Sequence, residues 1–204
     1  MVMYIKKLLL IHGYTSNMQS MQKIKNKLQY YYDEIILIDI PGHGNNNLKF
    51  NLKNTIDYCI SIYDSISKRA KVDICGHSLG GMIASYIASI RNVNRLILLA
   101  PSFQILLNIN ALKPNDRFIN LRKTPSPIGF YSVYSYIKSN IWNIYCPCLV
   151  IFGEDDRVVS KGSIDFILTR VKNKKIAIIY KNVDHISIVE SDNVINGIIK
   201  FVNE

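Results

Sequence analysis

Residues 73–82 read DICGHSLGGM: an apolar run that stops at Gly76, a serine at position 78, and two further glycines at 80 and 81. The pattern G-x-S-x-G is typical of a sharp turn from a strand into a helix, because a side chain at either outer glycine would collide with neighbouring backbone. Such a turn lifts the serine hydroxyl above the sheet, where free helix N–H groups face any negative charge. The sequence therefore predicts a nucleophilic Ser78; the alternative is a glycine-rich turn with an idle serine.

Short apolar runs and amphipathic stretches alternate on both sides of this turn. The apolar runs are continuous, as is typical of strands covered on both faces of a sheet, and they span 5–11, 35–40, 72–75, 96–100, 148–152 and 176–180. Apolar residues recur at helical spacing over 18–31, 52–67, 79–90, 161–170 and 192–201. The alternation predicts an α/β fold, with a mostly parallel sheet of about six strands and an active site at the carboxyl ends of the strands.

Residues 101–145 interrupt the alternation. They are rich in aromatic residues and contain four of the six prolines, Pro101, Pro114, Pro125 and Pro127. The segment is too long for a plain connection, so we predict a single domain over 1–204 with a cap or lid inserted at 101–145. The alternative is that the aromatic side chains merely pack the insertion onto the body, and both can hold.

A serine hydroxyl is a weak nucleophile that needs a base, and the base needs an acid to orient it. On an elbow of this kind the three residues follow the chain order serine, acid, histidine. Of the four histidines, only His185 comes late enough. Glu154, Asp155 and Asp156 follow the run that ends at 152, and their spacing from Gly153 favours Asp156 as the acid, with Asp155 second. The alternatives are a surface histidine and a solvated acidic turn.

Acyl transfer also needs N–H donors for the negative oxygen of the tetrahedral intermediate. The first apolar run ends in Ile11-His12-Gly13-Tyr14, where a glycine lets the next amide turn inward. We expect the backbone N–H groups of Tyr14 and of Leu79, the residue after the serine, to form this oxyanion hole. The alternative for His12-Gly13 is a plain turn.

These stretches together resemble the α/β-hydrolase superfamily, most of all small carboxylesterases and monoacylglycerol-lipase-type enzymes. The likeness spans nearly the whole chain and rests on LLLIHGYTSN (8–17), ILIDIPGHG (36–44), VDICGHSLGGMIA (72–84), NRLILLAPS (94–102), CPCLVIFGEDDRVV (146–159) and VDHISIVE (183–190). The resemblance implies a catalytic triad of Ser78, Asp156 and His185, with Tyr14 and Leu79 as the oxyanion donors. It implies neither a metal nor an organic cofactor.

The chain departs from the family pattern in three places. Few residues precede His12, so the family's first two strands look absent and a trimmed sheet of six strands is expected. The predicted cap is short, which favours a more open pocket for small or extended esters. Asp184 stands where many relatives have glycine, and this carboxylate either raises the pKa of His185 or faces water.

Composition bounds the other classes of function. The 204 residues are 49% hydrophobic, enough for one packed domain. The net charge is +10 but the lysines are scattered, so we expect a solvated basic surface and no nucleic-acid partner, with weak association with anionic membranes left open. The four cysteines lack C-x-x-C spacing and are expected to be reduced. With no signal peptide or membrane-spanning run in view, a cytoplasmic protein is the expectation.

The sequence thus favours a serine hydrolase that cleaves carboxylic esters, short-chain acyl or glyceryl, through an acyl-enzyme intermediate. Its expected partner is a small-molecule ester. The same residues also serve thioester and carbon–carbon bond hydrolysis in enzymes of this fold. A non-catalytic, ligand-binding member would show a broken triad, and all three residues are present.

Overall fold

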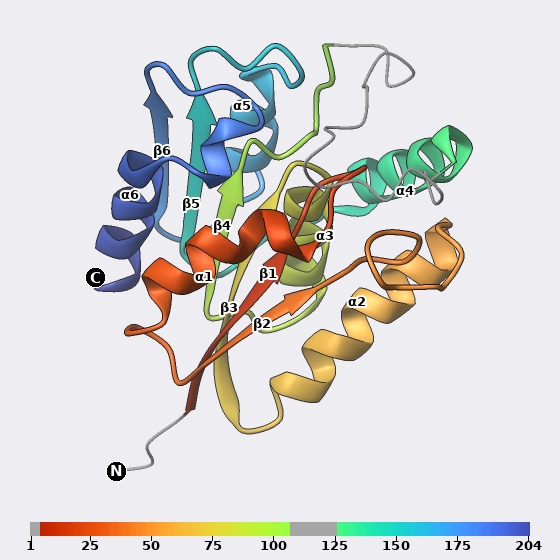
Figure 1. Cartoon of the computed structure of the whole chain (residues 1–204), viewed down its shortest axis with the longest axis horizontal. Helices are drawn as coiled ribbons and strands as arrows, with labels where there is room; N and C mark the ends of the chain where they lie inside the picture. Colours follow the sequence, from red (N-terminus) through yellow and green to blue (C-terminus); the bar gives the residue numbers. More distant parts are fainter. Residues whose placement is uncertain (1–4, 107–125) are drawn as a thin grey trace.

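The computed structural model describes residues 5–106 and 126–204. Within these residues six strands form one sheet in the order β2-β1-β3-β4-β5-β6 (Figure 1), and each neighbouring pair is parallel. The strands are β1 (Ile5–Ile11), β2 (Glu34–Ile38), β3 (Ala70–His77), β4 (Arg95–Leu99), β5 (Cys148–Gly153) and β6 (Lys175–Tyr180). The predicted α/β fold with about six strands is confirmed.

Burial on both faces explains the unbroken apolar runs of the central strands. Every residue of β5 is buried, and so are the last four residues of β1 and of β4. β6 lies at the edge of the sheet, and exposed and half-buried residues alternate along it. The core therefore lies over β1, β3, β4 and β5, directly beneath the loops that follow these strands.

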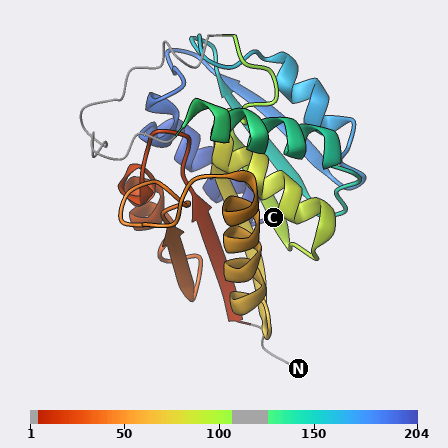
Figure 2. The same cartoon turned by 90° about the vertical axis from the view of Figure 1, so that its right-hand side faces the viewer.

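Helices cover both faces of the sheet (Figures 1 and 2). On one face α1 (Gln22–Leu28) contacts α6 (Asp192–Val202), and on the other α2 (Leu52–Ile66), α3 (Leu79–Ile90) and α4 (Pro127–Asn140) pack together. α5 (Gly162–Leu168) joins β5 to β6. For the helices that join strands, the division follows from right-handed crossovers, because the chain runs from β1 to β2 in one direction across the sheet and from β2 through β3 to β6 in the other. None of the helices in the described ranges has the length and apolarity to cross a membrane.

The bounds of most elements differ from the prediction by one or two residues at an end, and two elements differ most. β3 is longer than the predicted 72–75, because Ala70 already pairs with β1 and His77 still pairs with Leu99 of β4. The predicted helix over 18–31 begins as a 3-10 turn, η1 (Met18–Met21), before α1. The side chain of Asn17 caps this turn by accepting a hydrogen bond from the Gln19 N–H.

α4 belongs to the predicted insertion at 101–145, of which 107–125 lie outside the described residues. Figure 2 shows α4 running across α2 and α3. Its buried side chains include Phe130, Val133 and Ile137, and its Tyr134 hydroxyl donates to the Phe103 carbonyl at 2.8 Å. The cap as a whole stays a prediction.

The four cysteines are free and buried. Burial raises the pKa of the Cys59 and Cys146 thiols to about 12, and it raises the pKa of the other two as well. Because the thiolate is the reactive form, these side chains act as small apolar residues of the core.

A buried carboxylate anchors the sheet away from Ser78. Asp73 of β3 is fully buried and accepts hydrogen bonds from the Tyr32 hydroxyl at 2.7 Å and from the Asn94 amide at 2.5 Å. Burial raises the pKa of Asp73 above its usual value, although these two hydrogen bonds and the charge of Arg95 oppose the shift. The carboxylate thereby connects the segments that precede β2 and β4 to the middle of the sheet.

Tyr32→Phe should therefore lower the free energy of unfolding by about 1.5–3 kcal/mol, because it leaves a buried acceptor with one partner fewer. Urea denaturation measures the change. Tyr31→Phe removes a hydroxyl from the neighbouring half-buried tyrosine and should cost less than about 0.5 kcal/mol. Equal effects of the two variants would contradict the anchoring role of Asp73.

Candidate active site

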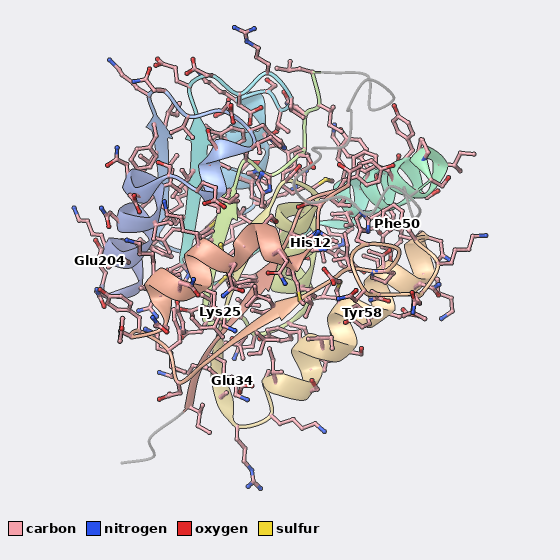
Figure 3. All side chains as sticks on the ribbon, in the orientation of Figure 1. His12, Lys25, Glu34, Phe50, Tyr58 and Glu204 are labelled. Carbon is pink, nitrogen blue, oxygen red and sulfur yellow. The ribbon has the colours of Figure 1, made fainter. Side chains whose placement is uncertain are left out.

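The carboxyl ends of parallel strands meet at one edge of the sheet, and each residue of the candidate site follows one of them. Tyr14 follows β1, Ser78 follows β3, Asp156 follows β5 and His185 follows β6. Figure 3 labels His12, which lies at this edge where β1 ends. The topology thus gathers residues that the chain separates widely.

Ser78 joins β3 to α3 through a strained turn. Its φ of +53° with ψ of −116° is a conformation that residues other than glycine rarely adopt. A Cβ atom on Gly76 would lie 2.3 Å from the Gly80 carbonyl oxygen, and one on Gly80 would lie 2.2 Å from the Ile11 carbonyl oxygen. The two bare glycines therefore let β3, α3 and β1 approach closely enough for the turn to form, as the 76–80 pattern predicts.

Ser78, His185 and Asp156 form a continuous line of hydrogen bonds. His185 Nε2 lies 2.9 Å from Ser78 Oγ, and His185 Nδ1 lies 2.8 Å from Asp156 Oδ2. Because an ionised carboxylate only accepts, Nδ1 carries the proton and Nε2 presents its lone pair to the serine hydroxyl. All three residues are buried. The structure thus brings together the three residues that the sequence singled out.

Asp156 is held in its ionised form. Burial opposes ionisation, but the hydrogen bond and positive charge of His185 outweigh it, helped by the N–H groups of Val158 and Val159, so the pKa of Asp156 lies below its usual value. These two amides donate to Oδ1 at 2.8 and 2.9 Å, which leaves Oδ2 for the imidazole. Asp155, the second candidate for the acid, is exposed, and its N–H donates to the Val183 carbonyl.

The peptide between Gly13 and Tyr14 is oriented by His12. The Ile40 N–H donates to His12 Nε2 at 3.2 Å, so His12 Nδ1 carries the proton and donates to the Gly13 carbonyl at 2.7 Å. Burial lowers the pKa of His12 to about 4, which keeps the ring neutral. In a trans peptide the N–H points opposite to the carbonyl, so the Tyr14 N–H is directed away from His12. Leu79 supplies a second N–H at the first turn of α3, which begins at that residue.

The position of His77 directly before Ser78 predicts a side chain that points away along the turn, and this prediction is wrong, because His77 lines the pocket over Ser78. Its Nε2 lies 2.8 Å from the main-chain oxygen of His185, and the two rings are 5.0 Å apart. The ring is buried. Its place directly before Ser78 in the motif is the one sequence signal that could have drawn attention to it.

A pocket of about 900 Å³, including its open mouth, lies over Ser78. Ser78, His77 and His185 line its floor, and its walls are mostly apolar: Tyr14, Ile105, Phe130, Val158, Val159, Ile186 and Val189. Phe130 comes from α4 and stands 4.7 Å from the ring of Tyr14, a contact that the sequence does not reveal. In residues 5–106 and 126–204, no cluster of three or more histidine, cysteine or acidic side chains is arranged to hold a metal ion.

Asp184 does not approach the serine. It is exposed, and its Oδ1 accepts hydrogen bonds from the N–H groups of Ile186 and Ser187, at the start of the 3-10 turn η4 (Ser187–Val189). These bonds fix the turn that follows His185. The carboxylate therefore faces water and shapes the loop.

The geometry at the sheet edge agrees with a comparison of the sequence to protein families. The model of the alpha/beta hydrolase family matches residues 8–136. The chain belongs to this family. The match covers the strand–turn–helix around Ser78 and the β1 loop that carries Gly13 and Tyr14.

The chain is also similar to individual known proteins and to solved structures. It is 33% identical over 103 residues to a pimeloyl-[acyl-carrier protein] methyl ester esterase of Pseudoalteromonas atlantica. The matched region covers 47% of this chain but only 38% of that esterase. The chain is 21% identical over 210 residues to a thermostable monoacylglycerol lipase of a Bacillus strain, covering 90% of this chain and 84% of the lipase. A solved structure of a metagenome-derived lipolytic enzyme superposes with a TM-score of 0.80 at 14% identity, covering 99% of this chain and 95% of the other.

Gly80→Ala should lower the free energy of unfolding by about 1–3 kcal/mol or more, because the new methyl group would meet fixed backbone of β1. Thermal or urea denaturation measures the loss. The control is Gly197→Ala on α6, where a Cβ would lie 2.3 Å from the Tyr180 hydroxyl, at the end of a side chain that can shift, and the helix gains about 1 kcal/mol of propensity. A Gly80 variant as stable as the Gly197 variant would show that the close approach is not required.

Proposed function

We propose that this chain is a serine hydrolase that cleaves carboxylic esters, of short acyl chains or of glycerol, with Ser78 as nucleophile, His185 as base and Asp156 as the acid that orients it. The observation that carries the proposal is the pair of contacts at His185: 2.9 Å to Ser78 Oγ on one side and 2.8 Å to Asp156 Oδ2 on the other. A histidine so placed can take a proton from the serine while a carboxylate faces the resulting positive charge.

In the first half-reaction Ser78 Oγ forms a bond to the acyl carbon, and its proton passes to His185 Nε2. The carbonyl π electrons move to the oxygen, which becomes negative. When the tetrahedral intermediate collapses, the bond between carbon and the alcohol oxygen breaks, and His185 returns the proton to that oxygen. The alcohol leaves and the acyl group stays on Ser78.

In the second half-reaction a water oxygen adds to the acyl carbon while His185 takes its proton. The bond to Ser78 Oγ then breaks, and the proton returns to the serine, so the products are one acid and one alcohol. In both half-reactions the N–H groups of Tyr14 and Leu79 donate hydrogen bonds to the negative oxygen. The orientation of the Gly13–Tyr14 peptide by His12 and the start of α3 at Leu79 support this assignment.

The relatives support an oxygen ester over the thioester and carbon–carbon alternatives. The named relatives are a methyl ester esterase and a monoacylglycerol lipase. Most of the pocket surface is apolar, which suits an acyl chain, and the polar residues of its lining, among them Ser16 and Glu190, can face an alcohol group at the open mouth. The complete line of hydrogen bonds through Ser78 argues against a purely ligand-binding protein.

Ser78→Ala tests the proposal directly. Turnover of p-nitrophenyl butyrate should fall by at least about 10³-fold, and a fluorophosphonate probe that labels the parent protein should no longer react. Ser85→Ala on α3, where the buried hydroxyl donates to the Gly81 carbonyl, controls for the loss of a serine near the turn. Circular dichroism checks that both variants fold. Hydrolysis retained in Ser78→Ala would remove this serine from the mechanism.

Asp156→Asn should lower kcat on the order of 10³–10⁴-fold, because an amide cannot hold the imidazole in the correct tautomer or balance its charge. Steady-state kinetics with p-nitrophenyl butyrate measures this loss.

The same variant should change how the free energy of unfolding depends on pH. The folded-state pKa of Asp156 lies below its unfolded value, so its charge stabilises the fold above about pH 4 and this contribution is lost as the pH falls through the folded pKa. The difference in unfolding free energy between the two proteins, measured by urea denaturation, should be largest near pH 7 and should shrink as the pH is lowered below about 4; a difference that does not change with pH would contradict the lowered pKa.

A further inference from the structure

The contact between His77 and His185 joins the turn of the nucleophile to the main chain of the base. His77 directly precedes Ser78, and its Nε2 lies 2.8 Å from the His185 carbonyl oxygen. This bond spans 108 residues of sequence. It therefore ties the two ends of the Ser78–His185 contact to each other independently of the side chains that react.

The hydrogen bond between His77 and the His185 carbonyl requires one tautomer of the His77 ring. A carbonyl oxygen can only accept, so His77 Nε2 must carry the proton, and Nδ1 is then an unprotonated acceptor. Nδ1 is buried and has no hydrogen-bond partner among the described residues. Burial, followed by the charge of His185, lowers the pKa of His77 to about 3, so the neutral tautomer persists over the working pH range.

The loop that carries His185 (residues 181–186) has further hydrogen bonds on either side of His185: the Val183 carbonyl accepts from the Asp155 N–H, and Asp184 bonds to Ile186 and Ser187 within the following turn. Val183 is buried against Gly153, where a Cβ atom would lie 2.0 Å from the Val183 carbonyl oxygen. Asp184 is exposed, and the side chain of Ile186 is 47% exposed. Between Val183 and the η4 turn, the His77 bond is thus the main-chain hydrogen bond, among the described residues, that joins this loop to the end of the strand that leads to Ser78.

We propose that His77 is a positioning residue: its Nε2–H holds the main chain of His185 so that the imidazole meets Ser78 Oγ at reacting distance. This role rests on the proposed hydrolase function but adds a residue to it. In this role His77 acts without contacting the substrate's reacting atoms and without transferring a proton. It acts through His185, and a displacement of about 1 Å at a reacting group can cost on the order of 10²-fold in rate.

The test compares His77→Met with His77→Gln. The two replacements have similar length, but only glutamine keeps an N–H donor at the position of Nε2. His77→Met should lower kcat for p-nitrophenyl butyrate about 10- to 100-fold with KM changed by less than about twofold, and by the same factor at every pH between 6 and 9. His77→Gln should recover most of the loss.

Tyr32→Phe is the control for stability, because it weakens the fold at the Asp73 anchor, away from the site, and should leave kcat unchanged. Hydrogen–deuterium exchange of residues 181–186 gives a readout that needs no catalysis. Exchange should rise in His77→Met and stay near the parent level in His77→Gln. If Ser78→Ala remained active, the hydrolase mechanism would fail while this exchange result could still stand.

Three outcomes would overturn the positioning role. An unchanged kcat in His77→Met would mean that the bond is not needed. A change in the shape of the pH profile would mean that His77 moves protons itself. An equal loss in His77→Gln and His77→Met would mean that the ring's packing matters and its N–H does not.

Discussion

The site depends on one backbone conformation, the φ of +53° at Ser78. This conformation costs on the order of 1–3 kcal/mol and persists only where the surroundings impose it. The Ser78 N–H donates to the Leu99 carbonyl of β4 at 2.9 Å, and its carbonyl accepts from the Gly81 N–H at 3.0 Å. The sheet holds the serine from one side and α3 from the other. The hydroxyl therefore stands above the strand ends, with no side chain at Gly80 to separate α3 from β1.

The parallel sheet brings Asp156 and His185 to the same edge as Ser78. The loop after β5 and the loop after β6 are joined by main-chain bonds, from the Glu154 N–H to the Tyr180 carbonyl at 2.8 Å and from the Asp155 N–H to the Val183 carbonyl at 3.0 Å. These bonds hold the loops that carry Asp156 and His185 side by side. Because β5 and β4 lie between β6 and β3 in the sheet, the loop after β6 must bring His185 across two strands to meet Ser78. The bond from His77 meets it from the other side.

The strand runs, the elbow and the order of the three residues could be predicted because each follows from local chemistry or from chain order. Gly76 and Gly80 indicate that backbone segments approach closely at the turn, and His185 is the one histidine that follows both the serine and the acid in the chain. The direction of His77 could not be predicted, because it depends on where a loop more than a hundred residues away brings its carbonyl. For the same reason the sequence did not reveal that Phe130 packs on Tyr14, a contact between the α4 helix and the loop after β1.

The partners of the four histidines explain why one of them is suited to accept a proton. His12, His43 and His77 each face a main-chain carbonyl, those of Gly13, Pro41 and His185 respectively. Burial lowers the pKa of the first to about 4 and of the other two to about 3, so these rings stay neutral and serve as fixed donors. His185 instead contacts the carboxylate of Asp156, which balances a positive charge on the imidazole as that charge forms. The fold thus separates four identical side chains into three structural donors and one group that can carry charge.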